Sequence, residues 1–293
     1  MVLHAPAKIN LYLRVLGKRK DGYHNVETVF EKISLFDKII FRSLKKNMIK
    51  ITCDDPCVPM DKKSLIYKTV KLFKNEFKVK NGVEVRIIKK IPVAAGLGGG
   101  SSDAASVLTG LNKLWRLSLN SRELSALGGN LGADIPFFLG KSSFAKGERI
   151  GDEITPLNWK IKLWHLLVFF PFKLLSKDIY TAYDKMVSSG LTKKPCINKI
   201  LPPVVEPSNM LCVNDFISND LEKIVLEKAP FVARVKKALS QIGIKHSLVS
   251  GSGPSVFTIF QRRKEAQAAR ESLIERFPIV KNEGWQIFIA ETL

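Results

Sequence analysis

Hydrophobic and polar residues alternate near the start of the chain. From residue 9 to residue 15 every second position is aliphatic, which is the period of a half-buried β-strand. The same period places Lys8 and Asn10 together on the opposite face of that strand. An Asp-Gly turn signal at residues 21–22 precedes an apolar stretch at residues 26–41. Residues 83–87 alternate again and predict another strand.

Helical spacing of apolar residues appears three times in the first half of the chain. It covers residues 64–77, residues 104–114 and residues 121–131, the last ending near Gly128, Gly129 and Gly132. For the helix at 104–114 we expect Ser101 or Ser102 as the N-cap and Asp103 in the first turn.

In the second half of the chain, strand-like alternation and helical spacing of apolar residues both occur. Around residues 156–162 we place a boundary, which divides the chain into domains at 1–157 and 158–293. Beyond it we expect strands at 164–170, 247–260 and 285–290, and helices at 179–186, 215–226 and 231–242. Strands and helices do not alternate strictly as in βαβ units, so the predicted fold class is α+β.

Composition narrows the class of protein. The chain has 293 residues, 45% of them hydrophobic and 25% charged, as in ordinary globular proteins. Residues 163–172 form an apolar run that is too short to span a membrane, and the N-terminus lacks the apolar core of a signal peptide. We therefore expect no membrane partner and a cytoplasmic location.

The chain is strongly basic. Lysine and arginine number 47 against 27 acidic residues, a formal net charge of +20. The basic residues are spread along the chain without aromatic interleaving, which favours a solvated surface or attraction of anionic substrates over nucleic-acid binding. Four cysteines at this length predict reduced thiols rather than a disulfide framework. Cys53 and Cys57 are close in sequence, whereas Cys196 and Cys212 are distant.

A glycine-rich stretch, VAAGLGGGSSDAA, occupies residues 93–105. No lysine follows the glycines as in a Walker A loop, and Ser101 stands where a dinucleotide-binding loop has its third glycine. The loop still leads into a helix whose first N–H groups are free to bind an anion. Several glycines in a row cost more backbone entropy than a plain turn requires, so anion binding is the favoured interpretation.

This loop resembles the ATP loop of the GHMP kinases. Four further stretches keep the order of that superfamily and extend the resemblance over essentially the whole chain: PAKINLYLRV at 6–15, DGYHNVETVF at 21–30, GADIPFFL at 132–139 and SGSGPSVF at 250–257. The resemblance implies a ribosomal-protein-S5-like N-terminal half, a ferredoxin-like C-terminal half and an active site in the cleft between them.

The DGYH segment points to one branch of the superfamily. That branch transfers the γ-phosphoryl group of ATP to the 2-hydroxyl of 4-diphosphocytidyl-2-C-methyl-D-erythritol, an intermediate of the non-mevalonate isoprenoid pathway. The resemblance thus implies ATP as co-substrate, Mg²⁺, a small-molecule cytidine diphosphate as the other substrate, and a bacterial or plastid protein, a bacterial one being favoured.

The resemblance also assigns residues to roles. Lys8 and Asp134 match the catalytic lysine and aspartate of the family. Without the resemblance, Lys8 would be interpreted as a solvated lysine of a strand and Asp134 as a turn residue. The match assigns ATP binding to Lys89 and to the loop residues Pro92, Val93, Ala94, Ala95, Gly96, Leu97, Gly98, Gly99, Gly100, Ser101 and Ser102. The metal ligands stay open.

For the cytidine substrate, the resemblance assigns stacking to Tyr23 and Tyr180 and a hydrogen bond to His24. Substrate contacts are further assigned to Asn10 and Ser176, and the third glycine loop is formed by Gly251, Ser252 and Gly253. The chain departs from the family at Ser64, where an asparagine that contacts adenine is usual. Another acceptor within the superfamily, a ligand sensor and an RNA-binding module are the competing functions.

Overall fold

The computed structural model describes residues 1–190, 217–277 and 284–293. A long antiparallel hairpin organises the first half of the molecule. It consists of β1 (Val2–Lys18) and β2 (His24–Leu44), which pair from one end to the other. Gly22, at a φ of 87°, lies in the turn between them, as the Asp-Gly signal predicts.

The hairpin lies within a larger sheet whose strand order is β3-β4-β2-β1-β8. β5 pairs with a further part of β2, and β6 with β5. The bounds of the added strands are Ile49–Cys53 (β3), Gly82–Ile88 (β4), Phe144–Glu148 (β5), Glu153–Leu157 (β6) and Ser218–Asn219 (β8). The alternation at residues 83–87 thus correctly predicts a strand.

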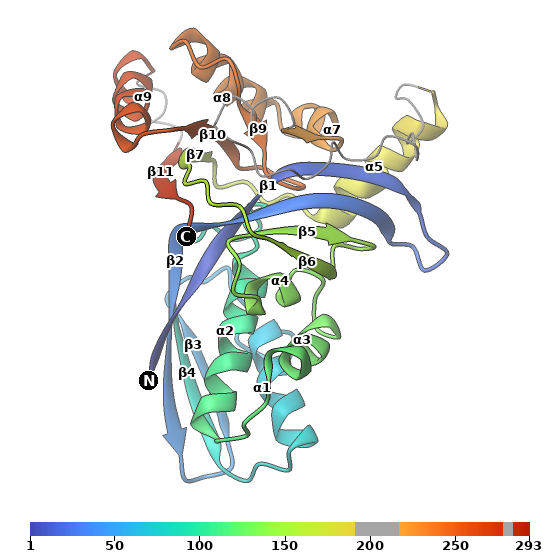
Figure 1. The fold of residues 1–293 in the computed structure, drawn as a ribbon, viewed down its shortest axis with the longest axis vertical. Coiled ribbons are helices and arrows are strands. Elements are labelled where there is room, and N and C mark those ends of the chain that lie inside the picture. Colours follow the sequence, from blue (N-terminus) through green and yellow to red (C-terminus); the bar gives the residue numbers. More distant parts are fainter. Residues whose placement is uncertain (191–216, 278–283) are drawn as a thin grey trace.

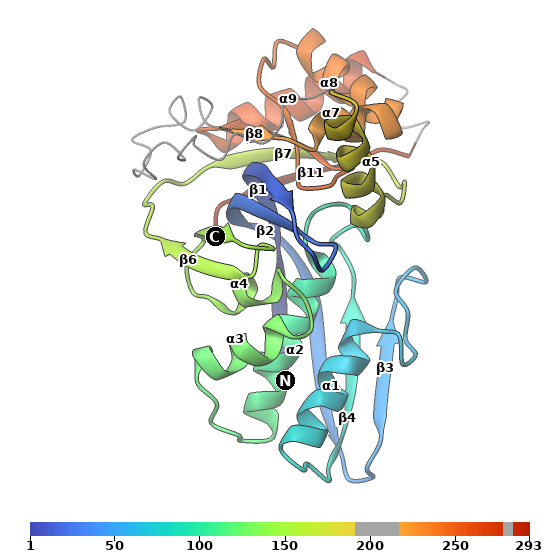
Figure 2. The same ribbon diagram turned by 90° about the vertical axis from the view of Figure 1, so that its right-hand side faces the viewer.

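Helices cover one face of this sheet (Figures 1 and 2). They are α1 (Leu65–Glu76), α2 (Gly99–Leu114), α3 (Ser121–Gly129) and the short α4 (Ile135–Leu139). The apolar faces of α1 and α2 and the inward side chains of β4 form one continuous core with no exposed member. All three helices predicted in this half are confirmed, and a capping box between Asn120 and Glu123 begins α3.

A second sheet, of order β11-β7-β10-β9, forms the other end of the molecule (Figure 1). Its strands are β7 (Trp164–Phe169), β9 (Leu248–Val249), β10 (Val256–Phe260) and β11 (Gln286–Glu291). The helices of this half are α5 (Ser176–Ser188), α7 (Glu222–Lys228), α8 (Pro230–Gln241) and α9 (Arg263–Arg276). The α+β prediction is confirmed.

Two expected helix starts are wrong. The helix α2 begins at Gly99, with Gly98 as its N-cap in a left-handed conformation, so neither Ser101 nor Ser102 caps it. The helix expected from residue 215 begins only at Glu222, because β8 lies before it and pairs with β1. Residues 215 and 216 are outside the described part of the chain.

The two sheets are joined by contacts far apart in sequence. Glu31 of β2 and His165 of β7 are fully buried, and Glu31 Oε1 lies 2.8 Å from His165 Nε2. Thr292 donates to the same carboxylate at 2.6 Å and forms a bridge with Ile33. The strands β1 to β6 all belong to the first sheet, β6 ends at Leu157, and β7 begins the second sheet at Trp164. The division of the chain into two domains at residue 157 stays a prediction.

Other predictions concern thiols and membranes. Cys53 and Cys57 are free thiols, whereas Cys196 and Cys212 lie outside the described residues. Over residues 1–190, 217–277 and 284–293, every helix is too short or too polar to cross a membrane.

Candidate active site

The candidate active site contains two polar side chains of β1. Lys8 and Asn10 share a face of the strand, as their spacing predicts, but this face is buried rather than open to water. The Lys8 ammonium donates to Asn10 Oδ1 at 2.6 Å, and the Asn10 amide donates to Thr28 Oγ1 at 2.7 Å. Thr28 donates in turn to the carbonyl of Tyr12 at 2.6 Å. This row of hydrogen bonds holds the Lys8 ammonium in one place.

Asp134 lies opposite Lys8, at the N-cap of α4. The next residue, Ile135, is fully buried and its N–H donates to the carbonyl of Gly132 at 3.2 Å. Gly128 leaves the room that Ile135 occupies, because a Cβ there would lie 2.6 Å from the Ile135 side chain. Asp134 Oδ2 lies 3.6 Å from Lys8 Nζ, and its side chain is 30% exposed. The carboxylate is therefore fixed beside a buried cation and open to a ligand.

The glycine loop packs tightly between β1 and the second half of the chain. A Cβ at Gly96 would lie 2.2 Å from the carbonyl of Ser250, and one at Gly98 would lie 2.9 Å from Lys8 Cγ. Both glycines have positive φ angles, 77° and 69°. The Lys8 N–H donates to the carbonyl of Leu97 at 2.9 Å. Only glycine meets both demands at these two positions, so the loop brings the start of α2 close to Lys8.

Lys89 lies on the other side of the loop and is buried between two carboxylates. It is paired with Asp37, and its ammonium lies 2.9 Å from Asp103 Oδ2. Burial, together with the nearby charge of Asp37, raises the pKa of Asp103 to about 8, although Lys89 opposes the shift. Asp37 also accepts from the backbone N–H groups of Lys90 and Ile91, at 2.6 and 2.9 Å. Lys89 thus braces the chain ahead of the glycine loop.

The third glycine loop connects β9 with β10 and contacts the first. Ser250 Oγ donates to the carbonyl of Gly96 at 3.0 Å, although 154 residues separate them. A Cβ at Gly251 would lie 3.0 Å from Asn10 Oδ1. Ser252 shares a hydrogen bond of 2.7 Å with Ser176 at the start of α5. The C-terminal half of the chain therefore packs against the glycine loop at residues 92–102.

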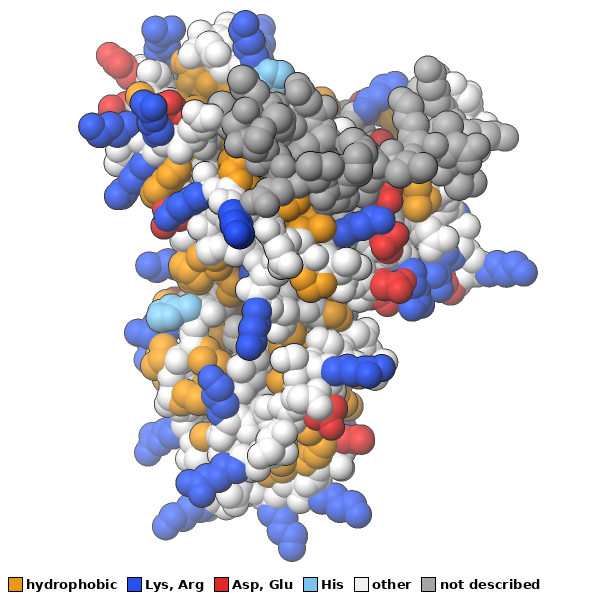
Figure 3. All heavy atoms as spheres, viewed as in Figure 1, with side chains coloured by type: hydrophobic (Ala, Val, Ile, Leu, Met, Phe, Trp, Pro, Cys, Tyr) orange, Lys and Arg blue, Asp and Glu red, His pale blue; other side chains and the backbone are white. Residues whose placement is uncertain are grey.

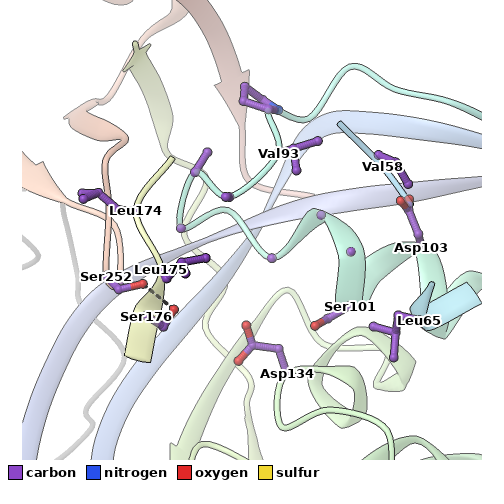
Figure 4. Close-up of a pocket in the computed structure, with 18 of the residues that line it drawn as sticks. Val58, Leu65, Val93, Ser101, Asp103, Asp134, Leu174, Leu175, Ser176 and Ser252 are labelled. Atoms are coloured by element: carbon purple, nitrogen blue, oxygen red, sulfur yellow. Dashed lines mark hydrogen bonds between the residues drawn. The ribbon is translucent and has the colours of Figure 1, made fainter. Parts of the chain in front are cut away.

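Two cavities meet between these elements. The first, of about 550 Å³, is lined by the glycine loop, Ser64, Lys89 and residues 174–176 (Figure 4). Among the loop residues 92–102, all except Leu97 and Ser102 line it. Figure 4 shows Asp134 and Ser101 pointing into one space, with the bonded Ser176 and Ser252 across from them.

The second cavity, of about 820 Å³, extends toward the tip of the β1–β2 hairpin. It shares Lys8, Ser101, Asp134, Ser176, Gly251 and Ser252 with the first cavity. A group bound in one cavity and a group bound in the other would therefore meet at Lys8 and Asp134.

The far end of the second cavity is lined by aromatic side chains. The His24 and Tyr180 rings stack with their centroids 4.8 Å apart, and Tyr23 beside them is 62% exposed. His24 Nε2 lies 2.6 Å from Asp184 Oδ1, and Lys18 donates to Asp184 Oδ2 at 2.7 Å. Partial burial raises the pKa of Asp184, but its hydrogen bonds with Lys18 and His24 bring it below its usual value. Asp184 stays ionised and orients the imidazole.

Comparison with known proteins decides the family. The chain is 37% identical over 277 residues to the 4-diphosphocytidyl-2-C-methyl-D-erythritol kinase of Clostridioides difficile, covering 94% of this chain and 92% of the relative. The chain belongs to the 4-diphosphocytidyl-2-C-methyl-D-erythritol kinase family. A member from Clostridium tetani is 37% identical over the full length of both chains.

Domain models and a solved structure agree with this family. The GHMP kinases N terminal domain matches residues 64–141, and the GHMP kinases C terminal domain matches residues 204–279. A crystal structure of 4-(cytidine 5'-diphospho)-2C-methyl-D-erythritol kinase has a TM-score of 0.79 at 28% identity, and the match covers 99% of this chain and 98% of that chain. The predicted GHMP kinase fold is confirmed, and the family consists of small-molecule kinases.

The structure gathers the residues that the kinase-family resemblance singles out. Lys8, Asp134, the glycine loop and the third glycine loop surround the junction of the two cavities. The aromatic residues and Ser176 line the second cavity. Lys89 lines the first cavity, but its ammonium is held by Asp37 and Asp103. Ser64, the position at which the chain departs from the expected pattern, also lines this cavity.

Sequence reasoning missed several residues of this kinase site. Asp184 could have been noticed, because it follows Tyr180 by four positions and therefore shares its helix face. Asp37 and Thr28 gave no such signal, because each lies in a strand whose partner residues are distant in sequence. Ser250 precedes the quoted SGSGPSVF glycines and holds the first loop through its hydroxyl.

Proposed function

We propose that the chain transfers the γ-phosphoryl group of ATP to the 2-hydroxyl of 4-diphosphocytidyl-2-C-methyl-D-erythritol, giving the 2-phosphate and ADP. This is the reaction for which its relatives are named, within the non-mevalonate route to isoprenoids. The observation that carries the proposal is the meeting of two cavities at Lys8 and Asp134. One cavity would hold ATP and the other the cytidine diphosphate, so the two reacting groups would come together there.

The glycine loop would hold the phosphates of ATP. It leads into α2, whose first N–H groups and positive dipole end favour an anion. Gly98 lies beside Lys8, whereas Gly99 lies beside Lys89, whose ammonium is already paired with Asp37 and Asp103. The positive charge nearest the phosphates would therefore come from Lys8. Phosphoryl transfer needs such positioning and charge neutralisation more than covalent help.

Lys8 and Asp134 would act at the reacting hydroxyl. The acceptor oxygen forms a bond to the γ-phosphorus while the bond to the bridging β–γ oxygen breaks, and the hydroxyl proton passes toward the Asp134 carboxylate. Lys8, whose Nζ lies 3.6 Å from that carboxylate, would neutralise charge that develops on the phosphoryl group. Asn10 would assist by holding the Lys8 ammonium through their hydrogen bond.

The second cavity would bind the cytidine end. Tyr23 and Tyr180 offer aromatic faces, and His24, oriented by Asp184, offers a hydrogen bond to the edge of the base. Burial raises the pKa of Tyr180 well above its usual value, so its phenol stays neutral and available for stacking. Ser176 and Ser252 lie where the two cavities join, within reach of a diphosphate or the sugar alcohol.

A magnesium ion fits the donor groups at this junction. Ser101 and Asp134 present oxygen atoms to the same space, and Mg²⁺ is commonly bound by one or two protein oxygens together with substrate phosphates. In the described part of the chain, no cluster of three or more His, Cys, Asp or Glu side chains offers a metal site. When bound, the ion would neutralise phosphate charge, with the Ser101 hydroxyl as a protein ligand and Asp134 left to accept the hydroxyl proton.

We further propose that this kinase works in the bacterial cytoplasm, with small molecules rather than nucleic acid as partners. The bacterial source of its named relatives supports the bacterial part of this proposal.

The test is ADP release from Mg-ATP with the cytidine substrate, run beside homoserine, mevalonate and galactose. We expect turnover on the cytidine substrate alone. Asp134→Asn and Lys8→Met should each lower kcat by roughly a hundredfold or more, since both groups act on the reacting atoms. Circular dichroism of both variants should match the parent protein.

Turnover on a different acceptor would retain ATP binding but reject the assignment of the second cavity. Near-normal kcat in either variant would remove that residue from the mechanism. If none of the acceptors is phosphorylated while ATP still binds, the chain would be a ligand sensor rather than a kinase.

A further inference from the structure

A second buried lysine lies next to Lys8 in the sheet. Lys32 on β2 is the direct antiparallel partner of Lys8 on β1, so the two side chains leave the same face of the sheet. Lys32 is only 6% exposed. Nothing in the sequence pattern singles it out, because it lies outside the quoted stretches and is one of two lysines within the apolar stretch at residues 26–41.

The two lysines contact opposite ends of α4. Lys8 lies 3.6 Å from Asp134, the N-cap of this helix, while the Lys32 ammonium donates at 2.5 Å to the carbonyl of Gly140, its C-cap. Lys32 also lies 5.1 Å from the centre of the Phe137 ring, halfway along the helix. The helix is thus held at both ends by neighbouring residues of one hairpin.

Aromatic rings fill the space between the two ammonium groups. The Lys8 ammonium lies 4.9 Å from the centre of the Phe30 ring, and the Phe30 and Phe137 ring centres are 4.9 Å apart. Both rings are almost fully buried. Movement of α4 would therefore disturb contacts of Lys8 as well as those of Lys32.

Lys32 is an unfavourable residue for stability alone. Burial lowers its pKa to about 8, and the described residues contain no carboxylate within ion-pair distance of it. A buried cation without a counter-ion lowers stability, so an apolar residue of similar size would serve the core better. What Lys32 does gain is a favourable position at a helix C-terminus, where the backbone carbonyls carry partial negative charge.

We propose that Lys32 is a positioning residue for phosphoryl transfer, which anchors the C-terminal end of α4 so that Asp134 stays beside Lys8. The five-residue helix is too short to hold its own geometry. The hydrogen bond from Lys32 to the Gly140 carbonyl restrains the C-terminal end of α4, as further helical turns would in a longer helix. The catalytic part of this inference rests on the proposed function.

Lys74 provides a matched control. Its ammonium also lies over an aromatic ring, 5.7 Å from the centre of Trp115, and also donates at 2.5 Å to a backbone carbonyl, that of Asn81. It lines neither of the two cavities that meet at Asp134. Lys74→Met therefore removes the same kinds of contact from a place unconnected with the site.

The experiment compares Lys32→Met, Lys32→Arg and Lys74→Met with the parent protein. We expect Lys32→Met to lower kcat by about tenfold or more while both KM values stay within about twofold, because only the placement of Asp134 changes. Lys32→Arg, which retains the charge and a donor, should recover most of the turnover. Melting temperatures should not fall more in Lys32→Met than in Lys74→Met. Equal kcat values in Lys32→Met and Lys74→Met would overturn the proposal.

Hydrogen exchange of the backbone amides at residue 135 and residues 137–140 tests the anchoring without any substrate. These amides should exchange faster in Lys32→Met than in the parent protein and be unchanged in Lys74→Met. This measurement separates the anchoring role of Lys32 from the proposed function, because the exchange rates do not depend on which alcohol is the acceptor. Unchanged exchange of these amides in Lys32→Met would reject the anchoring role.

Discussion

Asp184 shows how a residue outside the recognised motifs can decide the behaviour of one inside them. It accepts hydrogen bonds from Lys18 and from the ring of His24, which stacks on Tyr180 of the same helix. Because the Asp184 carboxylate can only accept, the Nε2 atom of His24 must carry a proton.

Replacing Asp184 with asparagine should weaken binding of the cytidine substrate. We expect its KM to rise about tenfold, with the KM for ATP unchanged, because a neutral partner orients the imidazole less strongly. Steady-state kinetics with each substrate varied in turn measures both constants. Asp178→Asn, an exposed position on α5, is the control. A parallel rise of the two KM values would contradict this role.

Lys32 also predicts a pH effect on stability. Its pKa is about 8 in the folded protein and near 10.5 when unfolded, so the unfolded chain binds more protons between these values. The unfolding free energy of the parent protein should therefore rise relative to Lys32→Met as the pH increases from about 8 to about 10.5, by up to about 3 kcal/mol.

Urea denaturation of both proteins at pH 7.5 and pH 10 measures this difference. Comparison of the two proteins cancels the titration of the other groups. A difference that is constant with pH would mean that Lys32 is not a buried cation.

At the scale of elements, the start of α2 depends on Gly98. It begins the helix from a left-handed conformation that few other residues adopt, and its missing side chain leaves room for Lys8 and for the Phe138 ring, each of which would lie 2.9 Å from an added Cβ. The Lys8 side chain of β1 and the Phe138 ring of α4 therefore both pack directly against the backbone of the glycine loop.

Gly98→Ala should disturb catalysis more than folding. The added methyl group would push Lys8 or the loop aside, and we expect kcat/KM for ATP to fall by about a hundredfold. Gly129→Ala is the control, because a Cβ there has only Pro136 nearby, at 3.9 Å. Similar kcat/KM values for the two variants would show that the loop tolerates a side chain at residue 98.

At the scale of the whole molecule, positive charge is the dominant surface property. Figure 3 shows lysine and arginine side chains over both halves of the visible face, with fewer acidic ones. The formal net charge is +20, whereas both proposed substrates carry phosphate groups. A long-range field of this sign attracts such anions to the protein before they reach the cavities.

Ionic strength should therefore change the capture of substrates. We expect kcat/KM for the cytidine substrate to fall about threefold or more between roughly 20 and 300 mM KCl, because salt screens the long-range field of the protein. The kcat at saturation should stay nearly constant, because salt screens the close contact between Lys8 and Asp134 much less. Initial rates at several salt concentrations measure both. A flat kcat/KM would mean that the surface charge serves solubility only.

Local patterns were sufficient for most of the secondary structure. The alternation from residue 9 to residue 15 and the helical spacing at 64–77 and 121–131 each correspond to an element, because one buried face imposes its period on the sequence. The resemblance of five ordered stretches was enough to predict the family. Two errors came at helix starts. A left-handed backbone at Gly98 starts α2 ahead of the expected serine cap, and the pairing of β8 with β1 delays the next helix to Glu222.

The sequence by itself determined the family and the elements that bear a clear hydrophobic period, and it supplied the candidate residues for the chemistry, since motifs and periods are made of side chains close together in the chain. Tertiary structure alone decided which of those side chains meet. It placed Ser250 against Gly96, committed Lys89 to two carboxylates, and brought Lys32 to the far end of the helix that begins at Asp134. Such contacts join residues tens to hundreds of positions apart, and the strand pairing and loop packing that create them leave no periodic pattern in the sequence.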